Sequence, residues 1–158
     1  MKIGNWKLKN NAGLYLIEVL ISISILAALS LVGVWYFSSA TKAEVLKKEK
    51  QGLSALLSEA RSLAISSKEA SRYGVHIEEF QAVLFKGSTY SSTDPNNVSM
   101  AFHSAVHVLS HSFTYGGDEI IFSRLTGGAL NFGTIKLSLI TNALASTTIT
   151  IRDTGVIE

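Results

Sequence analysis

Residues 14–37 form a continuous apolar run, LYLIEVLISISILAALSLVGVWYF, that contains one charged side chain, Glu18. As a helix, a run of this length would span about 36 Å, which is enough to cross a hydrocarbon layer about 30 Å thick. Trp35 and Tyr36 come near the end of the run, where aromatic side chains meet the interface of a membrane. The run therefore predicts a membrane-spanning helix, and the rest of the chain must fold on the C-terminal side of this helix.

The placement of charge predicts how this helix is oriented. Lys2, Lys7 and Lys9 precede the run, and lysines before a span favour a cytoplasmic N-terminus. Three of the 14 basic residues thus lie before the run. The charges of the 11 that remain nearly balance those of the 12 acidic residues. Because a near-neutral body lacks the strongly basic surface of nucleic-acid-binding proteins, we do not expect nucleic acid as a partner.

Two other interpretations of the run stay open, a secretory signal peptide and a plain signal anchor. A signal peptide has an apolar region of about 7–15 residues, which is shorter than this run. Residues 38–40, Ser-Ser-Ala, nevertheless match a small-x-small cleavage site that would release a soluble domain beginning at Thr41. A plain anchor has no use for Glu18, because inserting a carboxylate into an apolar layer costs about 2.5–3.5 kcal/mol.

Glu18 needs a positive partner, and no basic residue lies near it in the run. A cut between Gly13 and Leu14 would create one, because a new α-amino group is mostly positive at neutral pH. If the acid paired with the amine of a neighbouring chain, the pair would also favour assembly. The predicted assembly residue is therefore Glu18.

Residues 13–20, GLYLIEVL, with the basic segment before them, resemble the type III signal sequence of type IV pilins and type II secretion pseudopilins. That pattern has a short basic leader, a glycine, a cut, and an apolar helix whose fifth residue is glutamate. The resemblance implies that a prepilin peptidase removes residues 1–13, cutting after Gly13, and methylates the new N-terminus at Leu14. Leu14 and Tyr15 stand where the family usually has Phe and Thr, whereas Gly13 and Glu18 match it.

The helix is expected to continue beyond the apolar run, since no proline interrupts residues 14–72. Small polar residues cluster at 66–71 and predict that the helix ends near residue 68. Its second half, residues 38–70, is amphipathic because apolar residues recur there on one helical face. These residues are Leu46, Leu53, Leu56, Leu57, Ala60, Leu63 and Ala64.

Beyond Arg72 the apolar residues alternate with polar ones, which is typical of strands. Turn signals separate the candidate strands, which are 73–77, 80–85, 106–108, 120–122, 135–139, 148–151 and 156–157. We therefore expect an α+β fold in which the long N-terminal helix, residues 14–68, packs on an antiparallel sheet formed by residues 71–158. This arrangement is similar to the pilin fold.

Residues 57–65, LSEARSLAI, and the tail that ends in Gly155-Val156-Ile157 further resemble minor pseudopilins and minor pilins of the GspH/FimT type. Some members bind DNA through basic residues near that terminal glycine. Here Val156 and Glu158 occupy the place, and Arg152 is the basic residue nearby. DNA capture or adhesion at a filament tip is therefore kept as the alternative function.

Other candidate chemistry is weak. His103, His107 and His111 recur every four residues and would share a face on a helix, but on a strand they stand about 13 Å apart, too far for one metal ion. Tyr15, Ser22 and Ser24 in the apolar run are candidate interhelical donors, and the alternative for the serines is a bond to their own helix backbone. Two acid pairs are expected as solvated strand ends, with weak calcium binding or an intersubunit contact as the alternative: Glu78-Glu79 and Asp118-Glu119.

Together these features predict a structural subunit, not an enzyme, with no cofactor and no metal site. We expect it to be stored in the cytoplasmic (inner) membrane as a single-pass protein, with its C-terminal domain outside the cytoplasm, and then to enter an extracytoplasmic pilus or pseudopilus. The resemblance implies four partners: the prepilin peptidase, other pilin or pseudopilin subunits, a membrane assembly platform, and the lipid bilayer before assembly.

Overall fold

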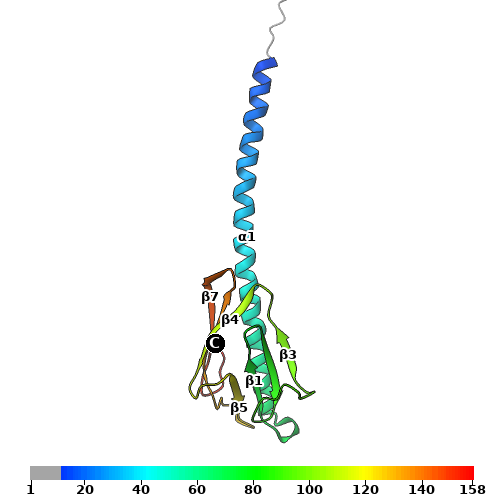
Figure 1. Ribbon diagram of the computed structural model, residues 1–158, viewed down its shortest axis with the longest axis vertical. Coiled ribbons are helices and arrows are strands. Elements are labelled where there is room, and N and C mark those ends of the chain that lie inside the picture. Colours follow the sequence, from blue (N-terminus) through cyan, green and yellow to red (C-terminus); the bar gives the residue numbers. More distant parts are fainter. Residues whose placement is uncertain (1–11) are drawn as a thin grey trace, which may run out of the picture. The chain divides into compact units, whose positions relative to one another are not determined.

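The computed structural model describes the backbone of residues 12–158 and the side chains of residues 15–30 and 42–158 (Figure 1). Residues 1–11, which make up most of the predicted leader, lie outside the described residues. The chain divides into two units, Met1–Thr41 and Lys42–Glu158, and each is considered by itself. The second is called the globular unit below.

The helix α1 spans Ala12–Ile65. It ends three residues earlier than predicted, because Ser67 takes the left-handed conformation with φ of 51° and an α-helix cannot pass through such a residue. The short 3₁₀ helix η1, Lys68–Ala70, follows directly. The chain then turns back along α1 to form its first strand.

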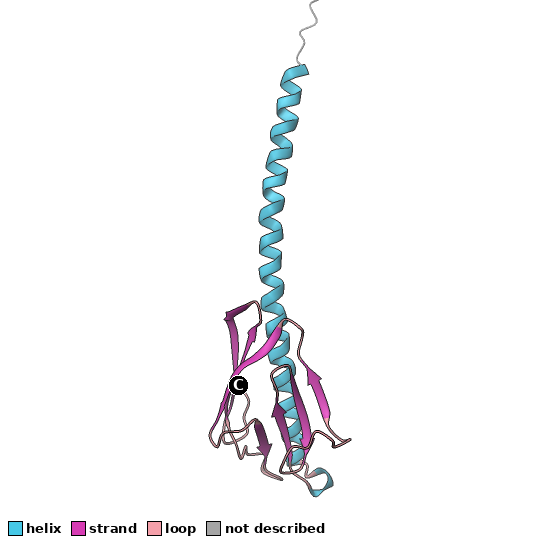
Figure 2. Ribbon diagram, viewed as in Figure 1, coloured by secondary structure: helices cyan, strands magenta, loops and turns pink. Residues whose placement is uncertain are grey.

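Seven strands follow in two antiparallel sheets, where the sequence predicted one (Figure 2). The first sheet has the order β3-β2-β1-β5, and the second has the order β4-β6-β7. The strands of the first sheet are β1 (Tyr73–Ile77), β2 (Gln81–Lys86), β3 (Val98–Ala101) and β5 (Glu119–Phe122). Those of the second sheet are β4 (Val106–Phe113), β6 (Gly133–Leu139) and β7 (Asn142–Ile151).

The predicted strands are confirmed except 156–157, where Ile157 forms only an isolated bridge with Ile151, and β3 was missed. β3 pairs with β2 at one border of the first sheet, and three of its four residues are exposed. Its residues alternate only over Val98, Ser99 and Met100, and an alternation of three residues is too short for period-two reasoning to identify a strand. β7 also begins six residues before the strand predicted at 148–151.

The core of the globular unit lies between the distal part of α1 and the two sheets (Figure 2). Six of the seven apolar residues predicted for one helical face are buried, and Leu63 is half-buried. Opposite this face, both sheets contribute fully buried side chains, among them Val75, Ile120, Phe122, Ile135, Leu137 and Ile149. The predicted packing of an amphipathic half-helix on antiparallel strands is therefore confirmed.

Candidate functional site

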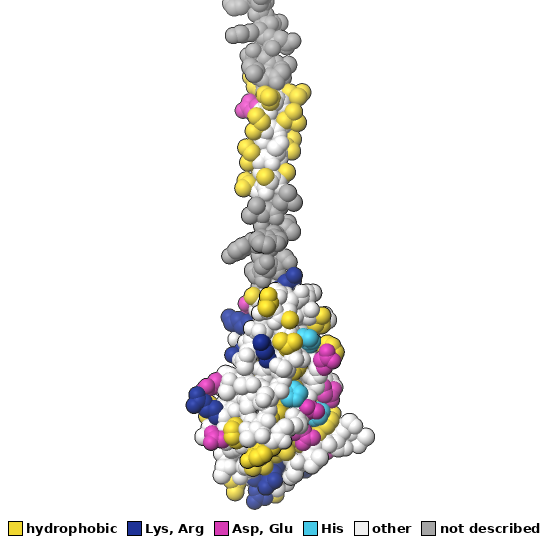
Figure 3. All heavy atoms as spheres, turned by 60° about the vertical axis from the view of Figure 1, so that its left-hand side comes forward, with side chains coloured by type: hydrophobic (Ala, Val, Ile, Leu, Met, Phe, Trp, Pro, Cys, Tyr) yellow, Lys and Arg dark blue, Asp and Glu magenta, His cyan; other side chains and the backbone are white. Residues whose placement is uncertain are grey.

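The described residues 15–30 of α1 present apolar side chains along the face of the helix that Figure 3 shows. Their large apolar side chains are between 54% and 67% exposed. A helix that is apolar on all sides needs lipid or other helices around it. The residues concerned are Tyr15, Leu16, Ile17, Val19, Leu20, Ile21, Ile23, Ile25, Leu26 and Leu29.

Within the described part of the chain, no helix has a stretch long and apolar enough to cross a membrane. The predicted span 14–37 extends past that part, because the side chains of residues 31–37 lie outside the described residues.

Glu18 is the single charged residue among residues 15–30 and is exposed. Among the described residues, no lysine, arginine or histidine forms an ion pair with its carboxylate. Gly13 and Leu14, the predicted cleavage pair, lie in the first turn of α1, one turn before Glu18. Residues four apart on a helix lie on the same face, so the backbone nitrogen of Leu14 and Glu18 belong to one side of the helix.

The serines of the apolar segment donate to their own helix. The hydroxyls of Ser22, Ser24 and Ser30 each donate to the carbonyl oxygen four residues earlier, at 2.8, 2.7 and 2.8 Å. This outcome favours the second of the two interpretations given for them, because a hydroxyl already bonded to its helix adds little polarity to the apolar surface. The carboxylate of Glu18 is therefore the strongly polar group on this segment.

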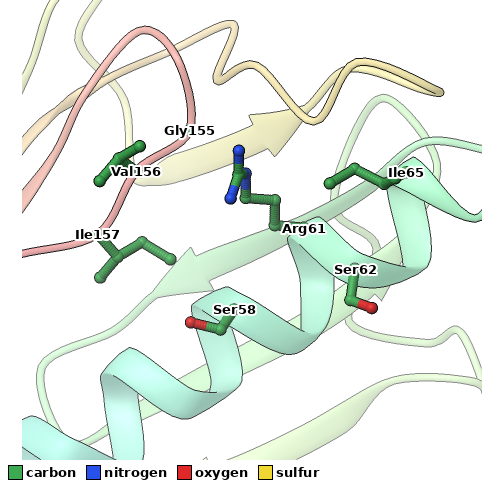
Figure 4. A pocket seen from close by; sticks show the side chains of 7 residues that line it. All are labelled: Ser58, Arg61, Ser62, Ile65, Gly155, Val156 and Ile157. Atoms are coloured by element: carbon green, nitrogen blue, oxygen red, sulfur yellow. The ribbon is translucent and has the colours of Figure 1, made fainter.

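A second cluster joins α1 to the end of the chain (Figure 4). The Nε of Arg61 donates to the carbonyl of Gly127 at 3.1 Å, and a terminal nitrogen of the same guanidinium donates to the carbonyl of Thr154 at 3.2 Å. Gly155 has a φ of +77°, and a Cβ built there would stand 2.0 Å from the Gly127 carbonyl oxygen. The arginine thus holds two glycine turns that have no room for a larger residue.

Sequence reasoning did not connect Gly127 with Gly155 and did not single out Arg61. The signal that could have found it is the position of this arginine directly after Ala60, which belongs to the predicted apolar face of the helix. A shallow pocket of about 320 Å³ adjoins the cluster and is lined by Ser58, Arg61, Ser62, Ile65, Gly155, Val156 and Ile157.

The three histidines do not converge. His107 and His111 lie in β4, as the alternation of its residues predicted, whereas His103 lies in the preceding turn. His107 Nε2 is 2.9 Å from the hydroxyl of Ser138, and His111 Nε2 is 2.9 Å from the carboxylate of Asp118. In the part of the chain that the structure describes, no group of three or more His, Cys, Asp or Glu side chains is placed to hold a metal ion.

The two acid pairs lie at strand ends, as predicted, but they have histidine neighbours that sequence reasoning did not foresee. A ring nitrogen of His76 is 3.9 Å from Glu78, and the other is 3.9 Å from Glu119. His107 is 3.7 Å from Glu79. Glu78 is only two residues from His76, but the contacts of His76 with Glu119 and of His107 with Glu79 join segments that are distant in the sequence, and local periodicity does not reveal such contacts.

Arg152, the basic residue nearest the terminal glycine in the sequence, is paired with an acid. A guanidinium nitrogen of Arg152 stands 2.9 Å from the carboxylate of Glu158. In space a second basic residue, Arg61, lies beside Gly155, and its guanidinium donates to two backbone carbonyls.

The fold has a counterpart among solved structures. The minor pseudopilin EpsH from the Type 2 Secretion System of Vibrio cholerae matches 72% of this chain and 94% of its own length, with a TM-score of 0.55 and 12% sequence identity. No family model matches the sequence, and none of the curated proteins matches it. The chain therefore has an α+β, pilin-like fold.

Proposed function

We propose that this chain is a structural subunit, a minor pilin or pseudopilin, of a type IV pilus or a type II secretion-like filament. The observation that carries the proposal is the exposed apolar surface of residues 15–30, interrupted by Glu18 alone. The globular unit does not need this surface, since it has a core of its own. The surface is then available for packing against copies of the same helix, and the fold shared with a minor pseudopilin supports this use.

Energetics favour two successive surroundings for the apolar segment. Each large apolar side chain gains about 1.5–3 kcal/mol when it leaves water, so ten of them will not stay exposed. Lipid satisfies that requirement before assembly, and a helical bundle satisfies it afterwards. We place the precursor in the cytoplasmic membrane, with residues 14–37 spanning it and the globular unit outside the cytoplasm.

Transfer from lipid to bundle gains little from the hydrophobic effect, because both surroundings are apolar. A directional interaction is then needed to favour the bundle. In our proposal the prepilin peptidase cuts after Gly13 and methylates Leu14, and the new amine is the positive partner of Glu18 on a neighbouring subunit. A pair of opposite charges is strong in an apolar bundle, so the unpaired acid in lipid becomes a paired acid in the filament. An assembly platform in the membrane and other pilin subunits complete the set of partners.

The test is replacement of Glu18 by alanine in the full chain, in cells that assemble the filament. We expect Glu18→Ala to enter the membrane as the unaltered chain does, because it removes a charge from an apolar helix. Assembly should be lost, since the amine has no partner. Sheared filaments and membranes are separated, and the subunit in each fraction is measured. The matched control is Glu59→Ala, which removes an exposed acid from the amphipathic part of α1.

Sequencing of the mature N-terminus accompanies this measurement. The proposal requires Leu14 as the first residue of both variants, whereas Thr41 would indicate a secreted domain and Met1 an uncleaved anchor. Normal incorporation of Glu18→Ala into filaments would contradict the assembly mechanism even if the cleavage occurs as proposed.

A further inference from the structure

The hairpin between β6 and β7 has an irregular tip, residues 140–145. Ser138 pairs with Ser146, but its neighbour Leu139 pairs with Asn142, so three residues of β7 are unmatched between these two pairs. The middle one, Leu144, is 94% exposed. Its backbone N–H donates to the side-chain oxygen of Asn142 at 3.1 Å, which holds the extra residues in place.

Irregular strand segments of this kind turn a side chain in a new direction. Here the effect is to expose a leucine almost completely, together with Ile140, which is 51% exposed. The tip contains no charged residue, and its polar members are Thr141 and Asn142. An uncharged tip with two exposed aliphatic side chains is more favourable at the boundary between lipid headgroups and acyl chains than in open water.

The tip lies at the end of the globular unit where the unit begins at Lys42 (Figure 1). Lys42, Lys47 and Lys48 are exposed on α1 at that end, and Figure 3 shows basic side chains there. Glu44 is the exposed acid among them, so the local charge is positive. Residues 38–41 alone separate Lys42 from the segment that we place in the membrane.

We propose that the tip, with Lys42, Lys47 and Lys48, binds the anionic headgroup layer of the membrane in which the subunit is stored. Leu144 and Ile140 enter the boundary between headgroups and acyl chains, and the lysines meet lipid phosphates. This inference rests on the proposed membrane storage of residues 14–37. It adds a second contact with the same bilayer, made by the globular unit, which must be released when the subunit leaves for the filament.

The test uses the full chain in vesicles, with single cysteines as labelling positions, because the chain has no cysteine of its own. Leu144→Cys reports on the tip, and Leu26→Cys reports on the apolar segment. The control is Tyr115→Cys, since Tyr115 is 80% exposed and follows the far end of β4. Val106 of β4 pairs with Leu139 beside the tip and Phe113 pairs with Gly133, so Tyr115 lies more than about 20 Å along the sheet from the tip.

Each variant carries a polarity-sensitive fluorophore and is placed in vesicles of phosphatidylcholine with or without phosphatidylglycerol, with a quencher attached to lipid headgroups. We expect the label at residue 144 to shift to the blue and to be quenched when phosphatidylglycerol is present, while the label at residue 115 is unaffected. Replacing Lys42, Lys47 and Lys48 together with glutamine should reduce the quenching at residue 144.

Three results would overturn the inference. If the labels at residues 144 and 115 behave alike while that at residue 26 is shifted to the blue, the tip does not bind lipid, although the membrane storage stands. If the label at residue 26 is not shifted to the blue either, the storage proposal fails as well. If quenching at residue 144 is absent but its blue shift grows with the amount of protein per vesicle, the tip contacts a second copy of the chain instead.

Discussion

Arg61 shows how one side chain can hold together parts of the sequence that no local pattern connects. It joins α1 to the turn at Gly127 and to the C-terminal turn at Thr154 through two backbone carbonyls. Both turns need glycine for a physical reason, because Gly127 and Gly155 have positive φ and a Cβ on either would meet an atom within 2.6 Å. The end of the chain is therefore fastened by an arginine and two glycines.

Replacing Arg61 with methionine should lower the free energy of unfolding by about 1–3 kcal/mol, because two carbonyl groups lose a charged donor while the aliphatic stem is kept. The measurement is urea unfolding of the full chain in detergent. Arg72→Met is the matched control, since Arg72 is exposed just beyond η1. Equal stability of the two variants would show that the Arg61 contacts contribute nothing.

Glu69 and Lys86 form an exposed ion pair between η1 and β2. The hydrogen bond and the charge of Lys86 lower the pKa of Glu69 below its ordinary value. A carboxyl with a lowered pKa in the folded state stabilises the fold above its unfolded pKa, and the contribution is lost as pH falls through the folded pKa. The unaltered chain should therefore lose slightly more stability on acidification than Glu69→Gln, and salt should reduce the difference. Thermal unfolding of both chains from neutral to acid pH measures it, and parallel curves would contradict it.

At the scale of the element, α1 has two kinds of surface. Residues 15–30 are apolar on all sides and exposed, whereas residues from Leu46 to Ala64 bury one face and leave the other in water. The periodicity of the sequence predicted this change, because the 3.6-residue period of an amphipathic helix appears only in the second half. The strands were predicted less completely, since β3 is an exposed edge strand of four residues whose alternation of apolar and polar residues is too short to identify it.

Truncation of leucines in the two halves should separate their roles. Leu53 is fully buried, so Leu53→Ala should lower the free energy of unfolding of the globular unit by about 2–5 kcal/mol. Leu26→Ala should leave it unchanged, because Leu26 is 63% exposed and outside that unit. Urea unfolding followed by far-ultraviolet circular dichroism measures the free energy of unfolding of both variants. A similar loss in the two variants would mean that the halves do not act independently.

At the scale of the whole molecule, the chain divides into two units, and we propose a separate role for each: the apolar segment packs in lipid or in the filament, and the globular unit stays folded outside the membrane. The globular unit has its own core, closed by two sheets and by the part of α1 from Leu46 to Ala64. A subunit built in this way can change the surroundings of its apolar segment, from lipid to other helices, without unfolding its globular unit. The hairpin tip, residues 140–145, is the place where we expect the globular unit itself to take part in that change.

The sequence by itself determined the long helix, the face that it buries, most of the strands, and the position of the lone acid in the apolar segment. These features are local, since periodicity, turn residues and charge spacing act within a few residues of one another. Only the tertiary structure decided that the strands form two sheets, that His76 lies near Glu119, and that Arg61 holds the C-terminal turn. Those contacts join residues far apart in the chain, and their geometry depends on how all the elements pack together.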